Sequence, residues 1–309
     1  MTRIPDIIDA HHHLWDLRAC HYPWLMAKGV KRFFGDPTPI QKNYLVGDYF
    51  KDIGDLPVNA SVHIQVGVEK DQAVAETRWL QSVADTGLGF PQGIVAFCDL
   101  ARPGTMACIE QHSRYPNLRG IRQIVGRSPE EDAVTGTNQL LADPVWIRNL
   151  ARLADCGLSF DLQLVPHQLR QAKAVLAKIP GLKVALCHCG SPFDQGEAGL
   201  ARWKTGIKEL AELPNVYCKL SGFGMFDHGW SPASIRPMVL HVIEVFTPER
   251  CMFGSNFPVD GLYAGYADIW TAYNYISRNF SASERQQLFA GTARRFYSIL
   301  DQDLSRSDT

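Results

Sequence analysis

The sequence predicts an α/β protein built as a closed (β/α)8 barrel. Short apolar runs alternate with amphipathic helical stretches from one end of the chain to the other, which is typical of a parallel sheet covered by helices. Eight such repeats favour a barrel over an open doubly wound sheet. The 309 residues suffice for one barrel, a fold that takes about 250 residues. The glycine-rich nucleotide motifs of open α/β sheets are absent from the sequence.

The expected strands are short apolar runs. They lie at 7–11, 60–66, 93–98, 118–124, 158–164, 182–188, 216–220 and 251–254. Their C-terminal ends meet at one end of a barrel, where active sites of this fold lie. Residues that follow each run are therefore the first candidates for a functional site.

Helical spacing of apolar residues separates many of these runs. The expected helices lie at 71–84, 138–154, 166–178, 197–213 and 233–246. No change of composition marks a linker, so residues 1–309 are expected to form a single domain. A long insertion at about 20–45, which contains Pro37 and Pro39, would cover the barrel mouth. The polar residues 301–309 are expected to be frayed.

Composition excludes several classes of function. Lys and Arg number 31 against 32 Asp and Glu, with no block of like charge. This balance gives no basic surface for nucleic acid. No apolar run reaches the roughly 18 residues of a membrane span, and no signal peptide is evident. The eight scattered cysteines are not the framework of a small secreted domain. We therefore expect a cytoplasmic protein with reduced thiols and a small-molecule substrate.

The strongest local motif is Asp-Ala-His-His-His-Leu-Trp at 9–15. Because residues two apart in a strand share a face, His11 and His13 should point together into the barrel mouth, with His12 turned away. Two imidazoles there can bind a divalent metal or polarise a carbonyl.

A second histidine closes the sixth expected strand, in Leu-Cys-His-Cys-Gly at 186–190. Strand alternation would send Cys187 and Cys189 to the face opposite His188, toward the helices. His188 is thus expected in the site and the two thiols outside it. On the second strand, Gln65 should reach the mouth and His63 should lie deeper, in the core.

A third motif, Phe-Gly-Ser-Asn-Phe-Pro-Val-Asp at 253–260, follows the last expected strand. A turn of this kind suits the tight backbone of a site, or equally a loop before the next helix.

Taken in order, these motifs resemble the amidohydrolase superfamily and, within it, the lactonase branch that includes 2-pyrone-4,6-dicarboxylate lactonase and L-fuconolactonase. The resemblance covers nearly the whole chain. It also includes Gly-Ile-Arg-Gln at 120–123, Phe-Asp-Leu-Gln at 160–163 and Tyr-Cys-Lys-Leu-Ser-Gly at 217–222. It implies a distorted (β/α)8 barrel of the metal-dependent-hydrolase type and hydrolysis of a cyclic ester.

The resemblance also implies roles for individual residues. His11, His13 and His188 would polarise the lactone carbonyl, either directly or as ligands of one divalent metal such as zinc or manganese. The branch contains metal-independent members, so both routes remain open. Substrate contacts are expected from Trp15, Gln65, Arg122, Gln163, His167, Lys219 and Ser221.

One position departs from the superfamily pattern. Asn256 stands where the family usually has an aspartate that deprotonates the attacking water and ligates the metal. An amide accepts no proton near pH 7 and is a poorer ligand than a carboxylate. An imidazole such as His188 could take the proton instead, and Asp260 or Asp161 could replace the missing base.

The sequence therefore predicts a hydrolase that opens a lactone of a sugar acid or an aromatic-derived acid. Cyclic amide hydrolysis and decarboxylation are alternative reactions of the superfamily. Asn256 also leaves open a non-catalytic ligand-binding barrel. The oligomeric state is not fixed, because several aromatic residues would suit either a substrate mouth or a contact in a homo-oligomer. They are Trp24, Phe33, Phe34, Tyr263, Tyr266 and Trp270.

Overall fold

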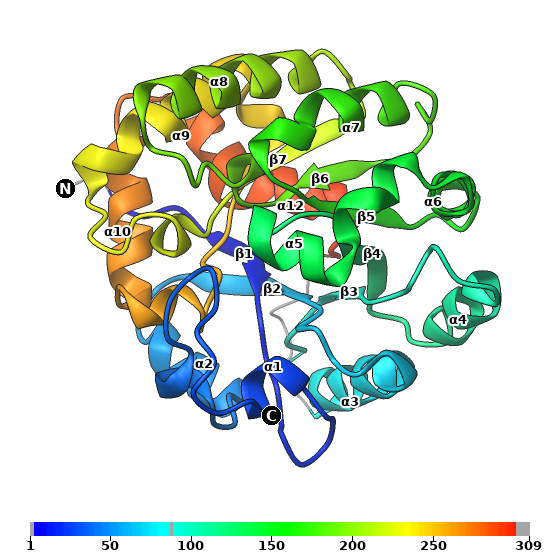
Figure 1. Ribbon diagram of the computed structural model, residues 1–309. Helices are drawn as coiled ribbons and strands as arrows, with labels where there is room; N and C mark the ends of the chain where they lie inside the picture. The colour runs from blue at the N-terminus through cyan, green and yellow to red at the C-terminus, as the bar shows by residue number, and fades with distance from the viewer. Residues whose placement is uncertain (1–2, 87–88, 301–309) are drawn as a thin grey trace.

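A computed structural model describes residues 3–86 and 89–300, so the polar segment 301–309 lies outside the described residues. Within them, eight parallel strands follow one another in chain order and form a nearly closed barrel surrounded by helices, which confirms the predicted fold class (Figure 1). The backbone N–H groups of Asn256 and His13 close the ring by donating to His11 and Phe257 at 2.7 Å each. No helix among the described residues has the length and apolar character needed to span a bilayer.

All the expected strands are present. Their bounds are β1 Ile7–His12, β2 Val58–Ile64, β3 Gly93–Ala96, β4 Leu118–Ile124, β5 Ser159–Gln163, β6 Val184–Leu186, β7 Val216–Leu220 and β8 Cys251–Phe253. Most of their residues are buried on both faces, as expected for strands between a barrel interior and a ring of helices.

The longer helices fall between the strands, except α10, which follows β8. Their bounds are α2 Val46–Ile53, α3 Ala73–Asp85, α4 Thr105–His112, α5 Pro129–Thr135, α6 Pro144–Asp155, α7 Leu169–Leu176, α8 Glu197–Ala211, α9 Pro232–Phe246 and α10 Tyr266–Ile276. The expected single helix at 138–154 is wrong. Pro144 breaks it, because proline disfavours the helical conformation of the residue before it. Asp143 instead caps α6 through the N–H groups of Val145 and Trp146.

The C-terminal segment closes the lower end of the barrel. Helices α11 Ala282–Gln286 and α12 Thr292–Phe296 flank a π-helical turn at 287–291. Side chains of this segment pack with the inward-facing residues of the strands. The cluster contains Ile8, Ala10, Ala60, Val62, Ile64, Val95, Ala185, Met252, Ala290, Ala293, Phe296, Tyr297 and Ile299. The functional residues are thereby confined to the upper end.

A bulge in β1 sets the direction of the histidines. Asp9 pairs with Ser61 and His12 with His63, so β1 contains one residue more than β2 between these pairs. Ala10 faces the barrel interior, whereas His12 stacks on Tyr49 of α2, with ring centroids 4.2 Å apart. Without the bulge, His12 would face the barrel interior as Ala10 does. The extra residue shifts the alternation of side chains by one, so that His11 and His13 face the interior instead.

The end of β6 departs from the expected strand. The strand stops at Leu186, and His188 and Cys189 take left-handed φ angles of 52° and 54°. Cys187 therefore keeps the inward direction of Ala185, and the expectation that its thiol faces the helices is wrong. Burial raises the pKa of this thiol to about 12, and the charged groups that influence it belong to the barrel interior. The turn, rather than strand alternation, brings His188 into the mouth.

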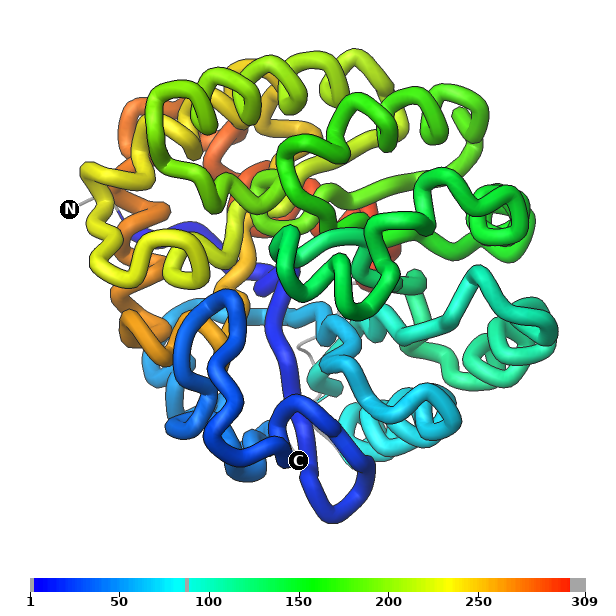
Figure 2. Tube along the Cα trace, viewed as in Figure 1, coloured from blue at the N-terminus to red at the C-terminus, as the bar shows by residue number. Residues whose placement is uncertain are grey.

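The expected insertion lies between β1 and α2. It contains the short helix α1 Pro23–Met26 and a single 3-10 turn at 38–40. Figure 2 traces this part of the chain as projecting loops, in dark blue. Its Trp24, Arg32, Phe33 and Phe34 line a pocket together with residues from the upper ends of the strands.

Candidate active site

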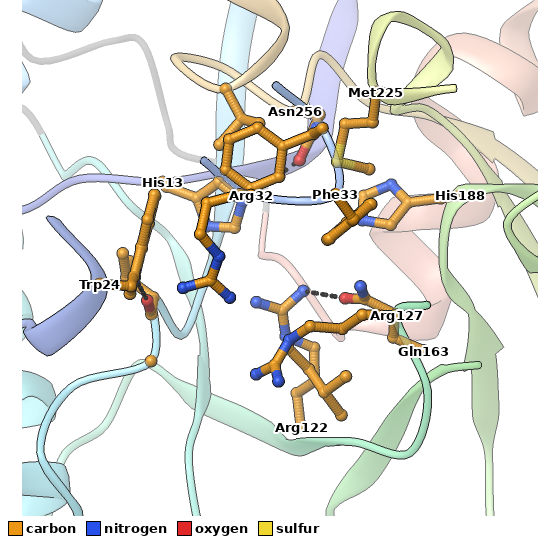
Figure 3. Close-up of a pocket in the computed structure, with 15 residues that line it drawn as sticks. His13, Trp24, Arg32, Phe33, Arg122, Arg127, Gln163, His188, Met225 and Asn256 are labelled. Carbon is orange, nitrogen blue, oxygen red and sulfur yellow. Dashed lines mark hydrogen bonds between the residues drawn. The ribbon is translucent and has the colours of Figure 1, made fainter. Parts of the chain in front are cut away.

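A single pocket at the upper end of the barrel gathers the main candidates (Figure 3). Its walls are contributed by the ends of several strands and by the insertion. The lining residues are His13, Trp24, Arg32, Phe33, Phe34, Val66, Gly67, Arg122, Ile124, Arg127, Gln163, His188, Met225, Asn256 and Val259. Five of them are among the site residues expected from the sequence: His13, Arg122, Gln163, His188 and Asn256. Trp24, Phe33 and Phe34 are among the aromatic residues that suited either a substrate mouth or a subunit contact.

The three expected histidines are neighbours. The ring centroid of His11 lies 5.1 Å from that of His13 and 4.4 Å from that of His188. His13 and His188 line the pocket, whereas His11 lies beneath them, and both of its ring nitrogens are buried without a hydrogen-bond partner among the described residues. Burial lowers the pKa of all three imidazoles, that of His13 to about 3. They are therefore neutral at pH 7.

Each pocket histidine is oriented by a hydrogen bond at Nδ1. In His13 this nitrogen lies 2.7 Å from the carbonyl oxygen of Ile64 and therefore carries the proton. In His188 it lies 3.0 Å from the hydroxyl of Ser221. A Cβ added to Gly222 would lie 2.5 Å from Nδ1 of His188, so glycine is needed for this ring position.

Asn256 connects His13 to a buried carboxyl group. Its Oδ1 lies 3.3 Å from Nε2 of His13, and its Nδ2 donates to Asp260 at 3.1 Å. Burial raises the pKa of Asp260 to about 7, although hydrogen bonds from Asn256 and from the backbone of Gly224 and Gly222 oppose this change. Asp260 does not line the pocket, so it reaches the site only through Asn256.

Asp9 holds the first and last strands together. Its carboxylate accepts hydrogen bonds from the N–H of Ser255 at 2.9 Å, the hydroxyl of Ser255 at 2.6 Å, and the hydroxyls of Tyr49 and Tyr266 at 3.0 and 3.1 Å. These bonds fix the turn in which Asn256 adopts a left-handed φ of 54°. Asn is one of the few residues that adopt this conformation readily.

Arg122 extends across the barrel from β4. It donates to Oε1 of Gln163 at 3.0 Å and to the backbone carbonyl of Gln65. The side chain of Gln65 turns back to the N–H of Gly67 at 2.6 Å and is not among the lining groups. Of these two glutamines, only Gln163 presents its side chain to the pocket.

Lys219 and Asp161 form a buried ion pair below the pocket. Nζ of Lys219 lies 2.5 Å from Oδ2 of Asp161, and neither side chain is exposed. The hydroxyl of Tyr297, from the C-terminal segment, donates to both oxygens of Asp161 at 2.9 Å. These partners place Lys219 and Asp161 in the framework of the barrel rather than against a substrate.

Two further candidates lie away from the pocket. Trp15 is buried and donates to the carbonyl of Lys42, and it borders a different hollow. His167 is exposed, and it lies in the 3-10 turn Pro166–Gln168 that leads into α7. Conversely, Arg32 and Arg127 line the pocket but carry no recognisable motif. Only their positions in an insertion and after a strand could have suggested them.

The three histidines do not form a metal-binding set as their side chains stand. Within the described residues, no three side chains of His, Cys, Asp or Glu converge closely enough to hold an ion. Asn256 also supplies a neutral oxygen where a carboxylate would bind more strongly. The mechanism proposed for this site therefore uses side chains alone.

Comparison with known proteins agrees with this architecture. Residues 8–299 match the amidohydrolase family. The uncharacterized protein y4mH of Sinorhizobium fredii is 41% identical over 95% of this chain and 98% of its own length. L-fucono-1,5-lactonase of Burkholderia multivorans is 28% identical over 94% of this chain and 96% of its own.

Among solved structures, an amidohydrolase from Burkholderia multivorans with bound zinc superposes with a TM-score of 0.81. It is 27% identical, and the alignment covers 96% of this chain and all of that one. The ordered motifs, the barrel and the extent of these matches lead to one conclusion. The chain belongs to the amidohydrolase family and is a hydrolase of that superfamily.

Proposed function

We propose that this protein opens a lactone ring by hydrolysis. The observation that carries the proposal is that His13, His188 and Arg122 line one pocket at the C-terminal ends of the barrel strands. Such a pocket can place a water molecule and a carbonyl group between neutral imidazoles and a cation. Similarity to L-fucono-1,5-lactonase over nearly the full length supports the choice of a cyclic ester.

In this proposal His188 polarises the carbonyl. When the hydroxyl of Ser221 donates to Nδ1, the proton of the neutral imidazole resides on Nε2. That N–H donates to the carbonyl oxygen as negative charge develops there, and the nearby Arg122 stabilises the same charge. Preoriented donors of this kind often make the largest contribution to acyl transfer.

His13 serves as the base. Its Nδ1–H is directed to Ile64, so the lone pair is on Nε2. As the water oxygen attacks the carbonyl carbon, Nε2 takes the water proton. The same proton passes to the ring oxygen when the carbon–oxygen bond breaks. Asn256 and Asp260 act through His13 as positioning residues.

The test is a ring-opening assay on a panel of sugar-derived and aromatic-derived lactones, followed by acid release. His13→Gln and His188→Gln should lower kcat by about 10²–10⁴, the usual contribution of a general acid or base. A surface change, Arg170→Gln, should leave kcat unaltered, because Arg170 pairs with Glu209 on the exterior. Turnover of no lactone above the buffer rate would contradict the proposal. Turnover of cyclic amides or loss of CO2 from aromatic acids would assign the pocket to another reaction.

A further inference from the structure

Two cysteines that the proposed mechanism does not use line a second hollow. Cys98 follows β3, and Cys108 lies in α4, on the outside of the barrel (Figure 1). This hollow shares no lining residue with the candidate active site. Cys98 is buried, whereas Cys108 is only partly buried, so solvent reaches the pair through Cys108.

The turn before α4 brings the two thiols together. The hydroxyl of Thr105 donates to the carbonyl oxygen of Arg102 at 2.7 Å, which holds the first turn of the helix against the loop after β3. The sulfur of Cys98 lies 3.8 Å from the carbonyl oxygen of Thr105. Because Thr105 and Cys108 are three residues apart in one helix, they share a face. The thiols of Cys98 and Cys108 are consequently within hydrogen-bonding reach of each other.

The two thiols differ in their readiness to ionise. The hydrogen bond from Cys98 lowers the pKa of Cys108, and His112, one turn further along α4, acts in the same direction. The same hydrogen bond, together with burial, raises the pKa of Cys98. His112 is fixed in place, since its ring nitrogens lie 3.0 Å from the carbonyl oxygen of Phe97 and 2.9 Å from the hydroxyl of Thr77. Cys108 is therefore the thiolate of the pair, and a thiolate, rather than a thiol, is the nucleophile.

We propose that Cys98 and Cys108 form a site of reversible oxidation, at which a peroxide converts the two thiols into a disulfide. The sulfur of Cys108 attacks one peroxide oxygen, the oxygen–oxygen bond breaks, and the departing hydroxide takes a proton to become water. Cys108 is then a sulfenic acid. The sulfur of Cys98 attacks the sulfur of Cys108, whose hydroxyl group leaves with the proton of Cys98 as a second water. Overall, two thiols lose two electrons to one peroxide, and one disulfide and two waters form.

The other cysteines are placed differently. Cys187, Cys218 and Cys251 are buried, and burial raises the pKa of each thiol. Cys156 is exposed at the C-terminal end of α6. If exposure alone decided reactivity, Cys156 would be oxidised first. The position at which peroxide reacts therefore distinguishes a built pair of thiols from a merely accessible one.

Peptide mapping of the folded wild-type protein tests the inference. The protein is treated with hydrogen peroxide, then unfolded in N-ethylmaleimide to alkylate the remaining thiols, and digested. Trypsin leaves both cysteines in the peptide 79–114, because it does not cleave before Pro103. We expect this peptide to be unalkylated and two hydrogen atoms lighter, and to regain both thiols in dithiothreitol. Alkylation of both Cys98 and Cys108 after the peroxide treatment, or oxidation confined to Cys156, would overturn the inference.

Variants separate the roles of the two sulfurs. In Cys98→Ser, the sulfenic acid of Cys108 should persist and be captured by dimedone, because the serine hydroxyl still donates to Cys108 but cannot displace its oxygen. In Cys108→Ser, oxidation of Cys98 should slow by about 10-fold or more. Cys156→Ser is the matched control and should form the disulfide at the wild-type rate. Unaltered thermal unfolding of the reduced variants excludes a folding defect. Oxidation of Cys98 at an unchanged rate in Cys108→Ser would refute the role of Cys108 as the attacking thiolate.

Discussion

The Nε2 atom of His13 and the Oδ1 atom of Asn256 face each other at 3.3 Å. When the imidazole of His13 is neutral, both atoms are hydrogen-bond acceptors. The reason is that Nδ1–H of His13 donates to Ile64 and Nδ2 of Asn256 donates to Asp260. Protonation of Asp260 resolves the conflict. The side-chain amide of Asn256 can then turn by about 180°. The protonated Asp260 donates to Oδ1 of Asn256, and Nδ2 of Asn256 donates to Nε2 of His13. Ionised Asp260 keeps Oδ1 of Asn256 toward His13, where this oxygen would stabilise the imidazolium of the proposed mechanism.

This relationship predicts a pH dependence. The pKa of Asp260 is raised to about 7, so the carboxyl group ionises as pH rises through that value. kcat/KM for lactone opening should increase across the same range, because only the ionised form leaves Nε2 of His13 free to accept a proton. Asp260→Asn should remove the inflection. Measurement of kcat/KM from pH 5 to 9 checks this.

A second buried acid supplies the control. The pKa of Glu76 is also raised to about 7 by burial, but its carboxyl group contacts Val66 rather than Asn256. Glu76→Gln should leave the inflection in place. If the inflection survives Asp260→Asn and disappears with Glu76→Gln, the relay through Asn256 is refuted.

Restoring the aspartate usual in the family should destabilise this chain. Asn256→Asp places two carboxyl groups where an amide now donates to Asp260 at 3.1 Å. Like charges in a buried pair oppose each other, so the free energy of unfolding at pH 8 should fall by about 1–3 kcal/mol. The exchange Asn256→Asp with Asp260→Asn should recover most of this loss, because it retains one amide and one carboxyl. Urea unfolding of the four proteins tests it, and additive losses would count against direct contact.

The position of His188 should depend on Gly222. Alanine at this position meets Nδ1 of His188 at 2.5 Å and also strains a backbone with φ of +74°. We expect kcat to fall at least 10-fold, since a small misplacement of a catalytic group is costly. Gly157→Ala is the matched control, because its φ is +69° and nothing lies within 4 Å of the added Cβ. Equal kcat for the two variants would mean that the ring does not depend on this contact.

The buried pair of Lys219 and Asp161 should behave as framework. Lys219→Met leaves an uncompensated carboxylate and should reduce the free energy of unfolding by about 3–5 kcal/mol. The double change with Asp161→Asn should cost less than the sum of the single changes. Lys173→Met, which breaks the exposed pair with Glu212 at 2.6 Å, should cost about 0–1 kcal/mol. Chemical unfolding measures all of them.

The sequence predicts the barrel well because each strand is an apolar run of the right length. It also places His11 and His13 inward, since two residues share a face whether or not a bulge precedes them. It fails at Cys187, because the left-handed turn after β6 depends on contacts with other strands. The sequence also misplaces His167 and Trp15 for a related reason, since a turn and a loop, rather than a strand, set the directions of these side chains. Arg32 and Arg127 were not identified because their loops meet only in the folded barrel.

The packing of the C-terminal segment against the lower end of the barrel has a kinetic consequence. With Ala290, Ala293 and Phe296 filling that end, substrate and product travel by the same route at the upper end. In the proposed reaction, ring opening converts a cyclic ester into a carboxylate, and this anion must leave past Arg32, Arg122 and Arg127, which line the pocket. Release of product, rather than bond cleavage, would then limit the rate as product accumulates. The reaction rate in a progress curve should therefore fall while most of the substrate remains.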